Sequence, residues 1–175
     1  MLQERVDKAI RNVPDFPKPG INFKDITPVL HDPKLVEDLV IDMANWAKEK
    51  QIDAIVGVES RGFLFGVLLA QHLNVPFVMV RKKGKLPYET ISYKYDLEYG
   101  SAEIEMHVDA LLPGSRVLVH DDLLATGGTA VAAAELIRMQ QAEVAGFAFL
   151  VELAFLGGVE KLKTYSDNIY NLVTY

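Results

Sequence analysis

The sequence predicts an α/β domain in which helices flank a mainly parallel central sheet. Short apolar runs, of the kind that form buried strands, alternate along the chain with longer segments whose apolar residues have helical spacing. Half of the 175 residues are apolar, which is enough for a sizeable core. No internal repeat or change of composition marks a boundary, so we expect a single domain over residues 1–175.

The N-terminal region predicts a helix followed by an irregular segment. Apolar residues recur at helical spacing over residues 2–13, so we expect an amphipathic helix that stops before Pro14. Residues 15–30, DFPKPGINFKDITPVL, contain three prolines and a glycine but remain apolar. This composition favours an ordered, packed loop or small hood over about residues 12–30 rather than a disordered linker.

The rest of the chain alternates between helices and strands. Pro33 is expected to begin a helix that runs to about Lys50, and further helices are expected over residues 62–72 and about 129–139. We expect strands over residues 54–58, 76–80, 117–120 and 145–151, and a hairpin over residues 91–106. Open α/β sheets leave a crevice at the carboxyl ends of their strands, so a ligand is expected there.

Composition excludes several classes of function. The net charge of −6 and a pI near 5.2 argue against a nucleic-acid-binding surface. The chain has no cysteine, which excludes disulfides and thiol catalysis and fits a cytoplasmic location. No segment is apolar over the roughly 18 residues that a membrane span needs. Of the four histidines, His31, His72 and His107 stand in helix or loop contexts without a carboxylate-rich partner pattern, so no metal site made of protein ligands is expected.

The most informative stretch is residues 117–130, VLVHDDLLATGGTA. An apolar strand leads into two adjacent carboxylates, Asp121 and Asp122, and then into a turn that opens a helix. The glycines of this turn allow backbone amides to curl around a phosphate, and the helix N-terminus favours an anion at the same place. Carboxylates only accept hydrogen bonds, so the two aspartates suit the hydroxyls of a ribose. These residues predict a site for a ribose 5-phosphate.

The same residues could instead form a capped helix after a polar turn, without a ligand. That alternative leaves the second aspartate and the second glycine unexplained. His120, just before the aspartates, is expected to pack beside the strand.

The run DDLLATGGT resembles the PRPP (5-phosphoribosyl 1-diphosphate) motif of the type I phosphoribosyltransferase family, and particularly of its adenine-using members. The resemblance spans residues 13–153 and implies the reaction of adenine with PRPP to give AMP and diphosphate, in purine salvage. It also implies Mg²⁺ carried by the diphosphate, and a homodimer. Asp121 and Asp122 would bind the ribose. The 5-phosphate would be bound by Ala125, Thr126, Gly127, Gly128 and Thr129. A transferase for another purine base and a non-catalytic PRPP-sensing domain are the alternatives.

Two charged loops would bind the diphosphate. The segment ESRGF resembles the family's pyrophosphate loop, with an unusual, often cis, peptide between Glu59 and Ser60 and a supporting role for Arg61. On residue types alone, Ser60 could equally be a helix cap. The cluster RKKGK follows a strand, and by resemblance Arg81, Lys82 and Lys85 contact the diphosphate, some of them in the neighbouring subunit. A solvated charged loop is the alternative.

A hairpin and an aromatic segment would complete the site. The run YDLEYG resembles the family's flexible catalytic loop, here about residues 84–106. Glu98 would be the acid or base at the purine and Tyr99 a donor to the diphosphate. The run GINFKD resembles the adenine pocket, in which Phe23 and Leu153 enclose the base and the main chain of Asn22 and Lys24 reads its edge. Simple packing is the alternative for Phe23, and an edge hairpin for the loop.

Overall fold

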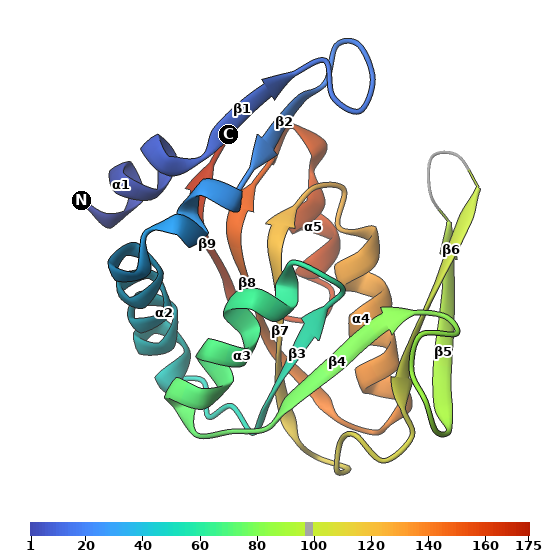
Figure 1. Ribbon diagram of the computed structural model, residues 1–175. Coiled ribbons are helices and arrows are strands. Elements are labelled where there is room, and N and C mark those ends of the chain that lie inside the picture. The colour runs from blue at the N-terminus through green and yellow to red at the C-terminus, as the bar shows by residue number, and fades with distance from the viewer. Residues whose placement is uncertain (97–99) are drawn as a thin grey trace.

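The computed structural model describes residues 1–96 and 100–175. Its centre is a seven-stranded sheet in the order β5-β6-β4-β3-β7-β8-β9 (Figure 1). The five strands from β4 to β9 in that order are parallel: β4 (Phe77–Lys82), β3 (Ala54–Val58), β7 (Arg116–Leu124), β8 (Glu143–Glu152) and β9 (Ile169–Thr174). The hairpin of β5 (Thr90–Asp96) and β6 (Ser101–His107) adds antiparallel to β4. The predicted α/β architecture with a mainly parallel sheet is confirmed.

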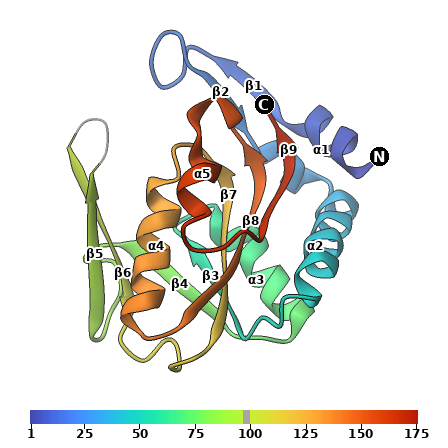
Figure 2. The same ribbon diagram turned by 180° about the vertical axis from the view of Figure 1, so that it is seen from behind.

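Helices cover both faces of this sheet, as the two opposite views show (Figures 1 and 2). One face is covered by α1 (Leu2–Ala9), α2 (Pro33–Lys48) and α3 (Gly62–Leu73), and the other by α4 (Gly128–Met139) and α5 (Gly158–Leu162). Strand residues alternate between the two cores: Val56 and Val119 face α4, whereas Ile55 and Leu118 face α2 and α3. A sheet covered on both faces explains why its parallel strands are almost continuously apolar.

The N-terminal segment differs from its prediction. The helix ends at Ala9, and Ile10 is already extended, with φ −67° and ψ 129°. Residues 11–14 form β1 (Arg11–Pro14), which pairs antiparallel with β2 (Asn22–Asp25) in a separate two-stranded sheet. The helix prediction to residue 13 was therefore wrong, because pairing with β2 outweighed the local helical spacing. The hood predicted over about residues 12–30 is ordered, and it includes this hairpin and a short 3-10 helix, η1 (Thr27–His31).

Other boundaries move for a related reason. β7 continues through the two aspartates to Leu124, because Leu123 and Leu124 pair with Val151 and Glu152 of β8. The prediction that the strand ends at residue 120 was thus too short. The sequence did not reveal β9, α5 or the short 3-10 helix η2 (Ala154–Leu156). Among the described residues, no helix combines the length and the apolar character needed to cross a bilayer.

Candidate active site

Loops that follow β3, β4 and β7 meet at one edge of the sheet, as expected for parallel strands. They enclose a polar cavity of about 300 Å³, lined by Glu59, Ser60, Arg61, Lys82, Asp121 and Asp122. All six lining residues were predicted as site residues. The tertiary structure therefore brings together the loop after β3, the last residue of β4 and the aspartates within β7, which are far apart in the sequence.

The cradle is the turn between β7 and α4. Residues 125–130 line a small cavity of about 80 Å³, and Asp121 is also part of its lining. Gly127 precedes α4 and has φ +80°, a left-handed conformation that favours glycine. A Cβ atom on Gly127 would also lie 3.0 Å from the carbonyl oxygen of Gly158. The first amides of α4 have no partner within the helix, so they are available to an anion.

The two aspartates have different surroundings. Asp122 is buried, and its Oδ2 lies 2.7 Å from Nε of Arg61 in an ion pair. Asp121 Oδ1 accepts the backbone N–H of Asp122 at 2.9 Å. Burial, and after it the negative charge of Asp122, raise the pKa of the Asp121 carboxyl well above its usual range. The pair therefore concentrates hydrogen-bond acceptors that a ligand with hydroxyl groups would satisfy.

Gly62 explains how Arg61 comes to lie beside this pair. A Cβ atom on Gly62 would lie 2.8 Å from the carbonyl oxygen of His120 and 3.0 Å from Asp121 Oδ1. Only glycine lets the start of α3 approach β7 so closely. His120 itself is fully buried, and its Nδ1 pairs with the carbonyl oxygen of Ala148 at 2.9 Å. Its expected packing role is confirmed, and burial lowers the pKa of His120 to about 4.

The peptide between Glu59 and Ser60 is cis, as the resemblance implied. The Glu59 carboxylate accepts hydrogen bonds from Nη2 of Arg81 at 3.1 Å, from Nε of Arg81 at 3.3 Å and from the backbone of Lys82 at 2.9 Å. The Arg81 guanidinium, above all, lowers the pKa of Glu59. Arg81 therefore faces Glu59 in this structure, whereas the side chain of Lys82 lines the polar cavity.

The basic loop after β4 is held by a residue that sequence analysis missed. Glu105 of β6 is only 4% exposed, and its Oε1 accepts the backbone N–H groups of Lys85 at 3.0 Å and Leu86 at 2.9 Å. Its Oε2 accepts from the hydroxyl of Thr90 at 3.3 Å. Burial alone would raise the pKa of Glu105, but these amides outweigh it and the pKa is lowered. The available signal was an acidic residue among the apolar residues of the strand.

A second cavity, of about 560 Å³, lies under the hood. Asn22, Lys24 and Leu153, which were predicted to bind adenine, line it, as does Thr126, which was predicted for the phosphate. The other lining residues are Gly20, Ile21, Phe155, Leu156 and Tyr175. Sequence analysis missed Phe155 and Tyr175, which follow the last predicted strand. The ammonium of Lys24 lies 3.5 Å from the centre of the Tyr175 ring and donates to Asn12 Oδ1 at 2.6 Å. The cavity is apolar enough for a flat aromatic ligand.

Phe23 lies beside this cavity and is not one of its lining residues. Its ring packs edge-on against Phe16, with centroids 5.3 Å apart, and the guanidinium of Arg61 lies 5.4 Å from its centre. The predicted residues Glu98 and Tyr99 lie outside the described residues. Among the described residues, no group of three or more His, Asp or Glu could hold a metal ion.

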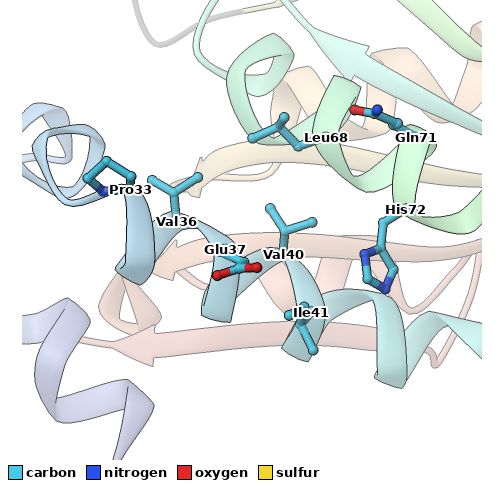
Figure 3. A pocket seen from close by; sticks show the side chains of 8 residues that line it. All are labelled: Pro33, Val36, Glu37, Val40, Ile41, Leu68, Gln71 and His72. Atoms are coloured by element: carbon cyan, nitrogen blue, oxygen red, sulfur yellow. The ribbon is translucent and has the colours of Figure 1, made fainter.

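A third cavity, of about 520 Å³, lies away from the site, between α2 and α3 (Figure 3). Most of its lining residues are apolar: Val36 and Val40 of α2 lie on one side and Leu68 of α3 on the other, and Glu37 and His72 also belong to the lining. Its lining contains no lysine, arginine or glycine, unlike the linings at the other edge. Leu68 also belongs to a row of exposed apolar side chains on α3, with Leu64 and Val67.

Proteins of known family resemble this chain in sequence and in fold. The family model for the phosphoribosyl transferase domain matches residues 29–170. The adenine phosphoribosyltransferase of Cytophaga hutchinsonii is 48% identical over 175 residues, which cover 100% of this chain and 97% of that protein. The crystal structure of adenine phosphoribosyltransferase from Rhodothermus marinus superposes with a TM-score of 0.93 at 49% identity, covering 99% of this chain and 98% of that one.

A third similar structure carries ligands. The adenine phosphoribosyltransferase of Saccharomyces cerevisiae, complexed with adenine and an imino-altritol bisphosphate, has a TM-score of 0.92 at 40% identity, over 98% of each chain. That protein therefore binds a purine base together with a phosphorylated, sugar-like molecule.

Proposed function

This chain belongs to the phosphoribosyltransferase family, and we propose that it transfers the 5-phosphoribosyl group of PRPP to adenine, forming AMP and diphosphate in purine salvage. One observation carries the proposal. The phosphate cradle, the acidic pair, the cationic loops and the apolar cavity occur together at one edge of the sheet: Asp121 lines both the polar cavity and the cradle, and Thr126 lines both the cradle and the apolar cavity.

The cradle and the acidic pair bind the ribose 5-phosphate. Backbone amides and hydroxyls of residues 125–129 bind the 5-phosphate at the positive end of α4. Asp121 and Asp122 accept hydrogen bonds from the ribose hydroxyls. Asp122 is buried and Asp121 is partly buried, which supports this role, because a desolvated acceptor gains more from a donor than one that water already satisfies.

The polar cavity of about 300 Å³ receives the diphosphate. The amides after the cis peptide would contact it directly, as would Arg61, Lys82 and Lys85, and Tyr99 would donate a hydrogen bond to it. Arg81 would also contact the diphosphate after its guanidinium breaks its hydrogen bonds with Glu59. These cations stabilise the negative charge that builds on the leaving group. Mg²⁺ bound to the diphosphate would neutralise more of that charge. The described residues offer no set of ligands that would hold the ion without the diphosphate.

Adenine binds in the apolar cavity under the hood. Leu153 and Phe23 would enclose the ring, and the main chain of Asn22 and Lys24 would read its edge. Phe23 reaches the base if the Arg61 guanidinium beside its ring shifts when substrates bind. Glu98 would exchange the proton of the purine nitrogen. The adenine in the similar yeast structure supports a base site in this fold.

The reaction is a displacement at the anomeric carbon. The bond from this carbon to the diphosphate oxygen breaks with its electron pair leaving on the diphosphate, and a purine nitrogen forms the new bond. The transition state resembles an oxocarbenium ion, without a covalent intermediate on the enzyme. Catalysis would rest on the positioning of two bound substrates and on electrostatic stabilisation.

The protein would act as a homodimer in the cytoplasm. Leu64, Val67 and Leu68 lie on one face of α3 and are 42%, 47% and 38% exposed, and Met79 of β4 is 41% exposed. Helix α3 is apolar on all sides, which is typical of a helix that is buried on all sides. We therefore propose that a second copy of the chain covers its exposed face. Val67→Glu should then produce monomers in sedimentation velocity, whereas Lys161→Glu, on the short α5, should leave the dimer intact.

The deciding assay is diphosphate release from PRPP and Mg²⁺ with adenine, hypoxanthine, guanine or xanthine, followed by chromatography of the nucleotide. AMP formed from adenine alone is the expected result. Reaction with another base would retain the cradle and overturn the base-pocket assignment. PRPP binding without product would identify a sensor instead of an enzyme.

A further inference from the structure

The hairpin of β5 and β6 makes a specific polar contact with the phosphate cradle. The hydroxyl of Tyr95, on β5, lies 3.1 Å from Oγ1 of Thr129, the second residue of α4. The hairpin runs alongside α4 in both views (Figures 1 and 2). Thr129 therefore lies between the cradle cavity, which it lines, and a further cavity beneath the hairpin, which it lines together with Tyr95.

Packing fixes the Tyr95 side chain. Its ring is partly buried against the core on the α4 side of the sheet. A Cβ atom on Gly128 would lie 3.7 Å from Cδ2 of this ring, which is ordinary van der Waals contact. The ring thus lies along the first turn of α4, and its hydroxyl reaches Thr129 from a position with little freedom.

Hydrogen-bond chemistry gives this contact a direction once a phosphate is bound. Either hydroxyl could donate in the free protein. A threonine hydroxyl has one hydrogen and two lone pairs, whereas an ionised phosphate oxygen only accepts. With phosphate in the cradle, the Thr129 hydrogen points to the phosphate, so Tyr95 must donate to Thr129 Oγ1. A hydroxyl that accepts one hydrogen bond donates a stronger one in return.

We propose that Tyr95 is a positioning residue for the 5-phosphate: its hydroxyl orients Thr129 so that the threonine hydroxyl donates into the cradle. The inference rests on the proposed function, which places a sugar phosphate there. Without the Tyr95 hydroxyl, the Thr129 hydroxyl can turn towards a backbone carbonyl of the preceding turn, as threonine does in helices. The phosphate would then lose an aligned donor while the fold stays unchanged.

Tyr93 provides a matched control. It lies two residues before Tyr95 on the same face of β5, and it packs against the same core. Its hydroxyl makes no hydrogen bond to any residue that the structure describes. Tyr93→Phe and Tyr95→Phe are therefore the same chemical change on the same strand, and only the second removes a contact with the cradle.

The test measures AMP and adenosine binding by titration calorimetry in the wild type, Tyr95→Phe, Tyr93→Phe, Thr129→Ala and the Tyr95→Phe/Thr129→Ala double variant. Tyr95→Phe should weaken AMP binding about three- to tenfold. It should leave adenosine, which lacks the phosphate, unaffected. Tyr93→Phe should match the wild type. The double variant should bind AMP no more weakly than Thr129→Ala, because Tyr95 acts through Thr129.

Three outcomes would overturn the inference. These are wild-type AMP affinity in Tyr95→Phe, an equal loss of affinity for AMP and adenosine, and full additivity in the double variant. A wild-type protein that binds no AMP and forms none from adenine and PRPP would instead overturn the proposed function, and this inference with it.

Discussion

Replacing Asp121 by asparagine should make the protein more stable and less active. The Asp121 carboxyl is desolvated and lies beside the charge of Asp122, and both effects raise its pKa. Asparagine has the same shape, so its Oδ1 can still accept the hydrogen bond that the backbone N–H of Asp122 donates to Asp121 at 2.9 Å in the wild type. The variant therefore removes an unfavourable charge and keeps the contact. If Asp121 binds a ribose hydroxyl, the KM for PRPP should rise about tenfold or more.

The size and pH dependence of the stability gain follow from the raised pKa. Each unit by which folding raises a carboxyl pKa costs about 1.4 kcal/mol of stability at pH values above both pKa values. We expect Asp121→Asn to gain about 1–3 kcal/mol at pH 8, which is about 2–10 °C in Tm for a domain of this size. As the pH falls towards 4, close to the ordinary carboxyl pKa of 3.8, the wild-type carboxyl becomes protonated in the unfolded state as well, so most of the gain should vanish.

The assay is thermal unfolding of both proteins at pH 4, 6 and 8, with PRPP kinetics at pH 8. Asp109→Asn is the control, because Asp109 is exposed and the change in charge is the same. It should alter neither Tm nor the KM for PRPP. A Tm for Asp121→Asn that is lower than wild type at pH 8, or a gain that is equally large at pH 4, would refute the electrostatic argument.

Three further predictions concern contacts around the site. Glu105→Ala should raise the KM for PRPP about three- to tenfold with little change in the KM for adenine, because two amides of the basic loop lose their acceptor; Glu89→Ala, at an exposed position just before β5, is the control in steady-state kinetics. His120→Gln should reduce the loss of stability on acidification by about 2 kcal/mol between pH 7.5 and pH 4.5 in urea unfolding, because the folded pKa of about 4 lies below the ordinary 6.5. Stability from that group is complete above pH 6.5 and is lost as the pH falls towards 4. Gly158→Ala should cost about 1–3 kcal/mol and raise the KM for PRPP, since its Cβ would lie 2.4 Å from the carbonyl oxygen of Ala125 in the cradle; calorimetry and kinetics measure the two effects.

Each of these has a clear contrary result. Equal KM values for PRPP in the Glu105 and Glu89 variants would mean that the buried carboxylate does not position the loop. A pH dependence unchanged in His120→Gln would place the acid sensitivity elsewhere. Wild-type stability in Gly158→Ala would show that α5 can withdraw from the cradle at no cost.

The sequence by itself determined the parts of this protein that depend on local patterns. The strand at residues 54–58 matches β3 residue for residue, and the predicted helices correspond to α2, α3 and α4 within a few residues. The paired glycines and the helix that follows were enough to predict a phosphate cradle. Periodicity and turn chemistry are properties of neighbouring residues, so they can be read without knowing which segments meet.

Only the tertiary structure decided which distant groups come into contact. Arg81 pairs with Glu59 across 22 residues of sequence, and Tyr95 meets Thr129 across 34. Neither contact leaves a local pattern. The helical spacing continues to residue 13, but a partner strand beginning at Asn22 makes residues 11–14 a strand. Such choices depend on the free energy of contacts that form when the chain folds, and one sequence window does not contain both partners.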